Sequence, residues 1–226
     1  MRVTVSADVF RKFPPLKVVL ISVALSDQKT HLHQSAHLLQ EVEKVIRLTF
    51  NRETALNHHL LSPWQVIKQG FGAKAKHYQT SVENLLQSVL NKKGIVEKDT
   101  CTNLIHYLSL KHIVPIGMDD VHLIKGNITF ALGTGKEKYK PILHQGELYY
   151  HDAAQLLGTN LDYWKNKKTA VSSKTTSALV HLEILPPITD GKLHEILQEA
   201  SRLFSSFCGA KTNVMVLDRK KRSAVV

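Results

Sequence analysis

The hydrophobic period of this chain changes twice between residues 100 and 132, and this segment constrains the possible fold more than any other. Leu104, Tyr107 and Leu108 recur at the spacing that gathers side chains on one face of an α-helix. Pro115 cannot continue a helix and favours an extended backbone in the residue before it. We therefore expect the helix to end near His112.

The sequence after Pro115 indicates β-structure. Residues 119–126 look like a turn, because this stretch separates two apolar runs and ends in glycine. Ile128, Phe130 and Leu132 then alternate with less apolar residues, which is typical of a half-buried strand. The whole segment predicts a helix, then a strand, then a hairpin.

Three polar residues of the predicted helix are the candidate catalytic residues. Asn103, His106 and Ser109 mostly share its polar side, and a helix that brings polar groups to the mouth of a sheet is a plausible site. The alternative is that these side chains face water, as polar residues on amphipathic helices usually do. The sequence leaves both interpretations open.

The remaining elements predict an α+β fold of one domain around a mixed sheet system. Residues 17–25 are β-branched and nearly all apolar, which predicts a central strand covered on both faces. Residues 31–50 predict a long helix whose apolar face carries Leu38, Val42, Val45 and Leu48. Further helices are expected after Ser62, Ser81 and Thr189, and strands at residues 178–185 and 214–217. We assign residues 1–218 to the domain and residues 219–226 to a basic tail, predicted to be disordered.

The charge of the chain favours a polyanionic partner. Thirty Lys and Arg against nineteen Asp and Glu give a net charge of +11, and neutralising phosphates releases condensed counterions. Nucleic acid is favoured over a membrane, since no amphipathic helix sets basic residues opposite an apolar face. The candidate RNA-binding residues lie in two basic segments that also contain aromatic residues: Lys74, Lys76 and Tyr78, then Trp164, Lys165, Lys167, Lys168 and Lys174. The alternatives are a solvated linker for the first segment and a lysine-rich loop kept for solubility for the second.

Several kinds of site lack their sequence signatures. Cys101 and Cys208 lie far apart with no CxxC motif, so neither a zinc cluster nor a disulfide framework is indicated. His33 and His37 have helical ligand spacing but lack the HExxH base and a nearby third ligand, so we predict no metal or cofactor. The N-terminus has no signal-peptide pattern and no apolar run spans a membrane, which predicts a cytoplasmic protein. The sequence does not predict an oligomeric state.

Three ordered motifs resemble the free-standing form of the B3/B4 domain of the phenylalanyl-tRNA synthetase β subunit, and the resemblance covers most of the chain. They are Lys74-Ala-Lys76-His-Tyr78-Gln-Thr-Ser81-Val82-Glu83 after a Trp-containing helix, Val114-Pro115-Ile116-Gly117 followed by Asp120-Val-His-Leu-Ile124-Lys-Gly126-Asn-Ile128, and Val180-His-Leu-Glu183-Ile-Leu185-Pro186-Pro187. The resemblance implies an α/β unit with an unusual β-sandwich, flanked by helices. It also implies contact with tRNA or aminoacyl-tRNA, since the synthetase domain hydrolyses tyrosine wrongly attached to phenylalanine tRNA.

The chain departs from the family pattern at the candidate catalytic helix. The family commonly has Asp-x-x-Asn-Tyr there, whereas this chain has Asn103-Leu-Ile-His106-Tyr107. An amide replaces the carboxylate and an imidazole replaces the amide, so an inherited pocket would bind its ligand differently. Our leading hypothesis is a tRNA-binding protein that clears mischarged aminoacyl-tRNA in trans, with His106 orienting the attacking water. The alternatives are a non-catalytic RNA-binding module and an amino-acid-binding sensor or partner protein.

Overall fold

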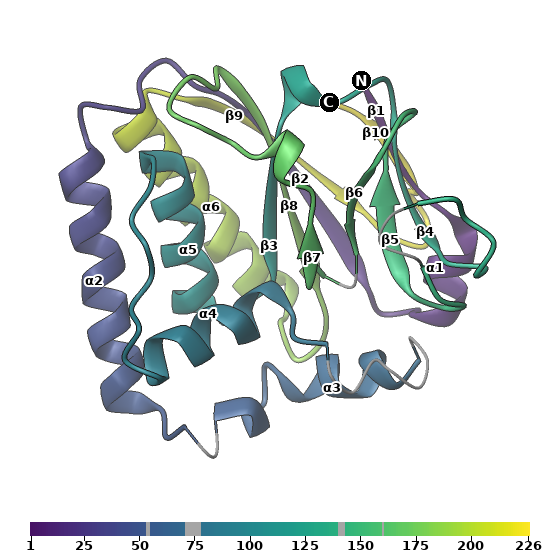
Figure 1. Cartoon of the computed structure of the whole chain (residues 1–226), viewed down its shortest axis with the longest axis horizontal. Coiled ribbons are helices and arrows are strands. Elements are labelled where there is room, and N and C mark those ends of the chain that lie inside the picture. Colours follow the sequence, from purple (N-terminus) through teal and green to yellow (C-terminus); the bar gives the residue numbers. More distant parts are fainter. Residues whose placement is uncertain (53–54, 71–77, 140–142, 160) are drawn as a thin grey trace.

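Two β-sheets pack face to face, and helices cover the outer face of one of them (Figure 1). The computed structural model describes residues 1–52, 55–70, 78–139, 143–159 and 161–226. The helices in this part of the chain are α1 (Ala7–Lys12), α2 (Leu32–Thr49), α3 (Ser62–Gln69), α4 (Ser81–Leu90), α5 (Thr100–His112) and α6 (Asp190–Cys208). Short 3-10 turns span η1 (Ala55–Asn57), η3 (Val121–Leu123) and η4 (Lys167–Thr169). The α+β class expected from the sequence is confirmed.

The strands divide between a six-stranded and a four-stranded sheet. The larger sheet has the order β10 (Ser223–Val225), β1 (Arg2–Val5), β4 (Ile128–Leu132), β5 (Leu148–His151), β6 (Leu156–Thr159) and β7 (Trp164–Lys165). The smaller sheet has the order β3 (Ile116–Asp120), β8 (Ser177–Ile184), β2 (Lys17–Ala24) and β9 (Lys211–Leu217). Among these pairs only β1 and β4 run parallel. The two sheets share a buried core, so they form a β-sandwich, as the resemblance implied.

Strand β2 is central in the smaller sheet, as its apolar sequence predicted. Successive side chains of a strand point to opposite faces, so both faces of β2 are apolar. Val19 and Ile21 pack toward the helices, whereas Val18 and Leu20 pack between the two sheets with Val3 and other residues of the larger sheet. Burial on both faces explains why residues 17–25 carry almost no polar side chain.

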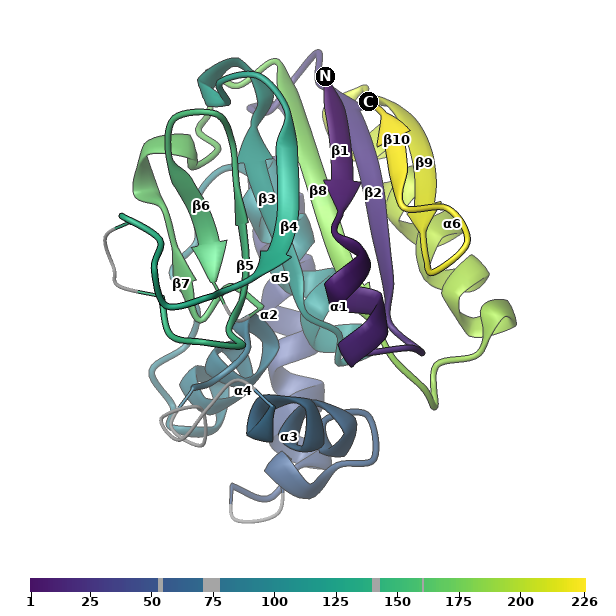
Figure 2. The same cartoon turned by 90° about the vertical axis from the view of Figure 1, so that its right-hand side faces the viewer.

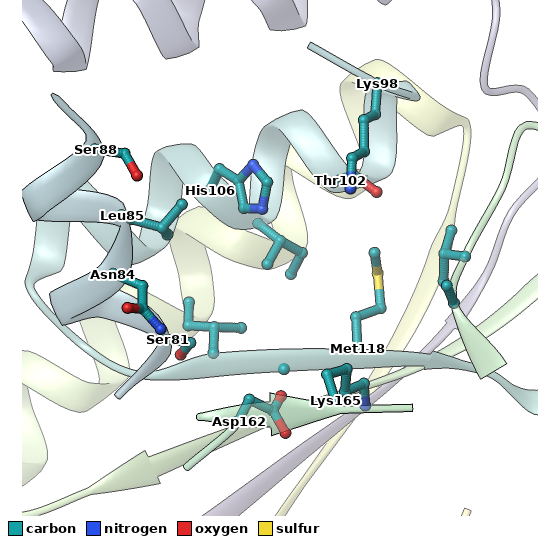
Figure 3. Close-up of a pocket in the computed structure, with 15 residues that line it drawn as sticks. Ser81, Asn84, Leu85, Ser88, Lys98, Thr102, His106, Met118, Asp162 and Lys165 are labelled. Carbon is teal, nitrogen blue, oxygen red and sulfur yellow. The ribbon is translucent and has the colours of Figure 1, made fainter. Parts of the chain in front are cut away.

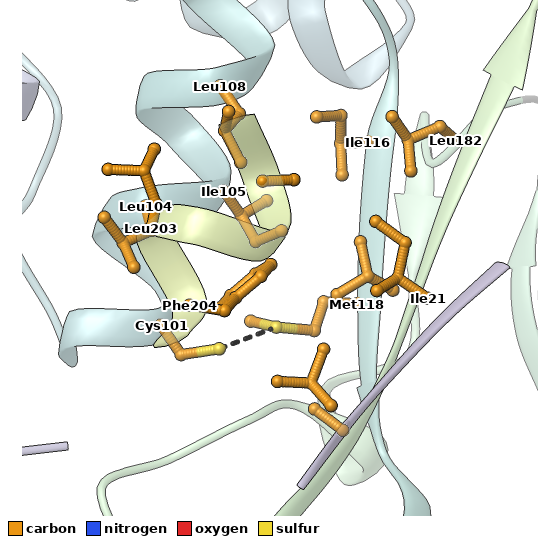
Figure 4. Close-up of a cluster of buried hydrophobic side chains, with 14 of the residues drawn as sticks. Ile21, Cys101, Leu104, Ile105, Leu108, Ile116, Met118, Leu182, Leu203 and Phe204 are labelled. Atoms are coloured by element: carbon orange, nitrogen blue, oxygen red, sulfur yellow. Dashed lines mark hydrogen bonds between the residues drawn. The ribbon is translucent and has the colours of Figure 1, made fainter. Parts of the chain in front are cut away.

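Helices α5 and α6 form the main core with the smaller sheet (Figure 4). Leu104 and Leu108 of α5 and Phe204 of α6 are fully buried among side chains of that sheet. The Asp99 carboxylate caps α5 by accepting a hydrogen bond from the Thr102 amide at 2.8 Å. The helix ends at His112, as predicted, with Ile113 in the left-handed conformation at φ 54°.

The predicted hairpin after α5 is wrong. Strands β3 and β4 belong to different sheets, β3 pairing with β8 and β4 with β1 and β5. The predicted turn over residues 119–126 also begins too early, because Asp119 and Asp120 belong to β3. These buried carboxylates are tolerated in the strand because they accept hydrogen bonds from the hydroxyls of Thr169 and Thr175.

The predicted apolar face of α2 is shifted around the helix axis. Val45 is 56% exposed and Leu48 is 88% exposed, whereas Leu39 and Ile46 are buried against α4 and α5. Apolar residues occur on more than one stripe of α2, and only the packing of the neighbouring helices selects the buried one.

The basic C-terminal segment is ordered, which corrects the prediction of a disordered tail. Strand β10 pairs antiparallel with β1, with Val3 opposite Ala224, and Val226 donates a backbone hydrogen bond to Met1 at 2.9 Å. The two chain ends lie side by side for this reason (Figure 2). Over the described residues, no helix combines the length and apolar character needed to cross a membrane.

Candidate functional site

A cavity of about 350 Å³ lies between α4, α5 and the edge strand β3 (Figure 3). The loop after η4 closes one side of it through Ala170 and Val171. The other lining residues come from four parts of the chain: Ser81, Asn84, Leu85, Ser88, Lys98, Thr102, Ile105, His106, Ile116, Gly117, Met118, Asp162 and Lys165. The volume is within the range of about 300–1,000 Å³ that is usual for small-molecule sites.

Buried polar contacts fix α4 beside this cavity. The Thr80 hydroxyl and the Glu83 carboxylate form a capping box at the start of the helix, which sets the position of Ser81 in its first turn. Glu83 also accepts a hydrogen bond from Lys68 of α3, with 2.8 Å between Nζ and Oε1. Both side chains of this ion pair are nearly inaccessible, so the pair ties α3 to α4.

His106 lies in the cavity wall as a neutral imidazole. Burial, together with the positive charge of Lys98, lowers the pKa of His106 to about 4. Its Nδ1 atom is inaccessible to solvent and has no hydrogen-bond partner in the described residues. Ser81 Oγ, on the opposite wall, is also buried without a partner among those residues. Two residues with an unpaired buried polar atom therefore line the same cavity, which favours a polar ligand, because buried polar groups are usually satisfied.

Gly117 on β3 makes room for charged groups at the floor of the cavity. A Cβ atom at this position would overlap with Asp162 Oδ2 and His181 Nε2. The absence of a side chain therefore lets Asp162 approach the strand and line the cavity. Burial opposes ionisation of Asp162, but the charges of Lys165 and His181 outweigh this effect and lower its pKa.

A buried network of charged side chains inside the sandwich holds Asp162 in position. His181 Nδ1 lies 2.7 Å from Glu183 Oε1, and His181 Nε2 lies 3.0 Å from the Tyr150 hydroxyl and 3.5 Å from Asp162 Oδ2. Burial disfavours the imidazolium, but the charges of Glu183 and Asp162 outweigh burial and raise the pKa of His181 to about 10. His181 is therefore the cation that holds two carboxylates together inside the sandwich.

Lys165 and Asp119 extend the same network to the cavity. Lys165 Nζ lies 2.5 Å from Asp119 Oδ2 and also donates to the Tyr150 hydroxyl. Tyr150 donates in turn to Asp162 Oδ1 at 2.9 Å, and burial raises its pKa well above the usual value. The cavity floor thus offers a carboxylate and an ammonium group whose positions are fixed by buried partners.

Of the three predicted catalytic residues, the structure brings only His106 into the cavity. Asn103 is fully buried, where its side chain donates to Ser35 Oγ at 3.2 Å and accepts from the Lys98 amide at 3.0 Å. Ser109 is also fully buried and donates to the Val114 carbonyl at 2.7 Å. The expected shared pocket is wrong for both residues, because α2 packs against α5 at Asn103 and the Ser109 hydroxyl is bound to the backbone just beyond the end of the helix.

The predicted RNA-binding residues have different surroundings. Lys167 and Lys168 on η4 and Lys174 beyond it are exposed, and they flank the residues that close the cavity. Lys165 instead faces inward to Asp119, and Trp164 is half-buried beside Leu143, Tyr149 and Leu156.

The first basic segment is only partly visible. The Tyr78 hydroxyl donates to Glu147, and its ring packs at 4.6 Å from that of Tyr163, so Tyr78 is not a free stacking surface. Lys74 and Lys76 lie outside the described residues.

Sequence reasoning missed Ser81, Asp162 and the His181 network as parts of the site. One signal was available, because His181 and Glu183 are separated by two in a predicted strand and must share a face. Asp162 gave no signal, since it lies in a segment without periodicity and reaches the cavity only through the sheet packing. Within the described residues, no group of three or more His, Cys, Asp or Glu side chains is arranged to hold a metal ion.

Comparison with known proteins identifies one family. The family model for the B3/4 domain matches residues 64–219, which include α4, α5, β3 and the His181 network. A search of curated proteins finds no match. The family match supports an RNA-binding role related to tRNA synthetases.

Proposed function

Because this chain belongs to the B3/4 domain family, we propose that it is a cytoplasmic tRNA-binding protein that hydrolyses mischarged aminoacyl-tRNA in the cavity beside β3. The observation that carries this proposal is that His106, Ser81 and Asp162 line one cavity, and that the first two residues each have a buried polar atom without a partner in the described residues. Hydrolysis of an aminoacyl ester presents three groups that these side chains can bind: the ammonium and the carbonyl oxygen of the ester, and the attacking water.

Asp162 is the group that binds the ammonium of the amino acid. Its lowered pKa keeps it ionised at neutral pH, and the buried network restricts its position. A fixed carboxylate lowers the reorganisation needed when the substrate binds. The ester then lies between α4 and α5, where the Ser81 hydroxyl and the Lys98 ammonium are available to donate to the carbonyl oxygen.

His106 orients the water. With a pKa of about 4, the imidazole is neutral and its unprotonated nitrogen accepts a hydrogen bond from water. The water oxygen attacks the carbonyl carbon, the bond to the terminal ribose oxygen breaks, and the water proton ends on the ribose hydroxyl. The products are free amino acid and tRNA, and no covalent enzyme intermediate is needed.

The exposed lysines beside the cavity bind the RNA end. Lys167, Lys168 and Lys174 flank Ala170 and Val171 in the sequence, and all three lysines are exposed, whereas Ala170 and Val171 line the cavity. Replacing all three with alanine should weaken tRNA binding and flatten its salt dependence, since each phosphate contact contributes to the slope of log K against log salt.

A panel of mischarged tRNAs tests the hydrolysis. Wild-type protein should release amino acid from at least one member faster than the uncatalysed rate, and His106→Ala should abolish the excess. His37→Ala, on the exposed face of α2, is the matched control and should retain wild-type rates. Equal rates for wild type, His106→Ala and buffer would reject the enzymatic proposal.

A second candidate function is amino-acid binding without hydrolysis. It is favoured by the low basicity of His106 and by the opposite charges of Asp162 and Lys165, which suit a zwitterion. Thermal unfolding with each of the twenty amino acids tests this, because a ligand that binds the folded state raises the melting temperature. Stabilisation together with uncatalysed deacylation rates would favour the second function over the first.

A further inference from the structure

A second hollow, remote from the cavity beside β3, is lined by three arginines. It has a volume of about 460 Å³ and lies between α1 and the loop that joins β9 to β10, with Ala7, Phe10, Arg11, Pro14, Arg219 and Arg222 in its walls. In Figure 2, α1 and this loop lie side by side at the edge of the sandwich. The two ends of the chain therefore build the hollow together.

The backbone of the basic loop is held by several hydrogen bonds. The Asp218 carboxylate accepts from the amides of Lys220 at 2.7 Å and Lys221 at 2.8 Å. The Arg222 carbonyl accepts from the Val5 amide at 2.8 Å, which joins the loop to the end of β1. Four consecutive cations, residues 219–222, are thus presented on a fixed turn.

Positive charge exceeds negative charge around this hollow. Arg11 pairs with Asp8 at 2.5 Å, and the Asp218 carboxylate is engaged by the turn. These two carboxylates face five cations, Arg11, Arg219, Lys220, Lys221 and Arg222, which leaves a formal excess of three positive charges. Guanidinium groups bind phosphate oxygens in a bidentate manner, so the hollow is suited to phosphate.

The lining favours a phosphodiester backbone over a nucleotide. Phe10 is 1% exposed, so its ring is not available to stack on a base. Among the residues that the structure describes, no amide or carboxylate side chain lines the hollow to read a base edge. Lys220 and Lys221 are exposed and continue the positive charge beyond the hollow, as an extended polyanion requires.

We propose that the arginine hollow is a second phosphate-binding surface for RNA, separate from the site of hydrolysis. It lies at the opposite end of the molecule from α4 and α5, with both sheets between them (Figure 1). One RNA would contact the protein with its end at the cavity and with its backbone at the hollow. This inference rests on the proposed binding of tRNA and not on the proposed hydrolysis.

Fluorescence anisotropy with labelled, uncharged tRNA over a salt series tests the hollow. The variant Arg11→Gln/Arg219→Gln/Arg222→Gln should weaken binding at least tenfold at low salt. It should also reduce the salt slope by about 2, because each phosphate contact contributes roughly 0.7–0.9 to the slope. The control Lys29→Gln/Lys93→Gln/Lys136→Gln removes the same charge from scattered exposed positions and should change affinity less than twofold.

The possible outcomes separate the hollow from the proposed function. If the arginine variant binds like the control while the Lys167, Lys168 and Lys174 variant binds poorly, the hollow is rejected and tRNA binding stands. Another outcome is that inorganic phosphate raises the melting temperature of wild type and not of the arginine variant, while both proteins bind tRNA equally. In that case the surface binds a small anion, and the RNA proposal is wrong. If wild type binds no tRNA, the proposed function fails first and the inference fails with it.

Discussion

Gly117 of β3 lies so close to Asp162 that a methyl group on residue 117 would overlap with its carboxylate. The same methyl group would overlap with the His181 ring, which holds Asp162 and Glu183. A single hydrogen atom in place of a side chain thus permits a charged network to approach the cavity.

Gly117→Ala should lower the free energy of unfolding by about 1–3 kcal/mol, because overpacking forces neighbouring groups to move. Urea titration measures this change. Gly191→Ala is the control, since a Cβ there would meet nothing closer than Thr189 Oγ1 at 3.9 Å, and it should be neutral or slightly stabilising. Equal stability of the two variants would contradict the packing described at Gly117.

His181 should make stability depend on alkaline pH. Its pKa is raised from 6.5 to about 10, so the folded protein binds more protons than the unfolded chain between these values. The stabilisation from His181 is complete below pH 6.5 and is lost as pH rises through about 10. Wild type should lose unfolding free energy over this range more steeply than His181→Gln. The exposed His194→Gln should follow wild type, and parallel curves for all three proteins would refute the raised pKa.

Substitutions of Asn103 and of His106 should have opposite effects: the first should lower stability, and the second should remove activity. Asn103→Ala should lower the free energy of unfolding by roughly 1–3 kcal/mol, because it removes the partner of the Lys98 amide and of the buried Ser35 hydroxyl. His106→Ala should lower the free energy of unfolding little through lost hydrogen bonds, because Nδ1 has no partner in the described residues. The same substitution should remove deacylation activity. Thermal unfolding and deacylation rates of both variants measure this, and a folded, inactive Asn103→Ala would return Asn103 to the candidate catalytic residues.

The pH profile of deacylation should reflect the environment of His106. If this residue orients water as a neutral imidazole, the background-corrected rate should lack an inflection near 6.5 and show one near 4. Single-turnover rates over a series of buffers measure the profile. An inflection near 6.5 would mean that the group assisting hydrolysis is not this buried imidazole.

The Lys68–Glu83 pair should behave as a buried ion pair. Lys68→Met should destabilise the protein by about 3–5 kcal/mol, because it leaves Glu83 charged and buried. Lys68→Met/Glu83→Gln removes both charges while glutamine retains a capping side chain, so it should recover much of that loss. Chemical denaturation of Lys68→Met, Glu83→Gln and the double variant measures the coupling between the two side chains. If the double variant loses the sum of the two single losses, the two side chains are not coupled.

Local sequence patterns predicted most of the elements but not how they associate. The helix α5 ends before Pro115 as expected, since the effect of proline depends on the backbone of a few residues. The hairpin between β3 and β4 was wrong, because strand pairing depends on which edges meet in space. The predicted face of α2 was correct at Val42 but wrong at Val45 and Leu48, because the buried face depends on where the neighbouring helices pack.

The sequence by itself determined the class of fold, the ends of the principal helices and the family resemblance, because these depend on short-range order and on motifs. Tertiary structure alone decided which polar residues meet. It buried Asn103 and Ser109 in structural hydrogen bonds, left His106 on a cavity, and brought Asp162 and His181 from distant segments to Gly117. The reason is physical: the pKa and the available partners of a polar side chain are set by everything packed around it, most of which is distant in sequence.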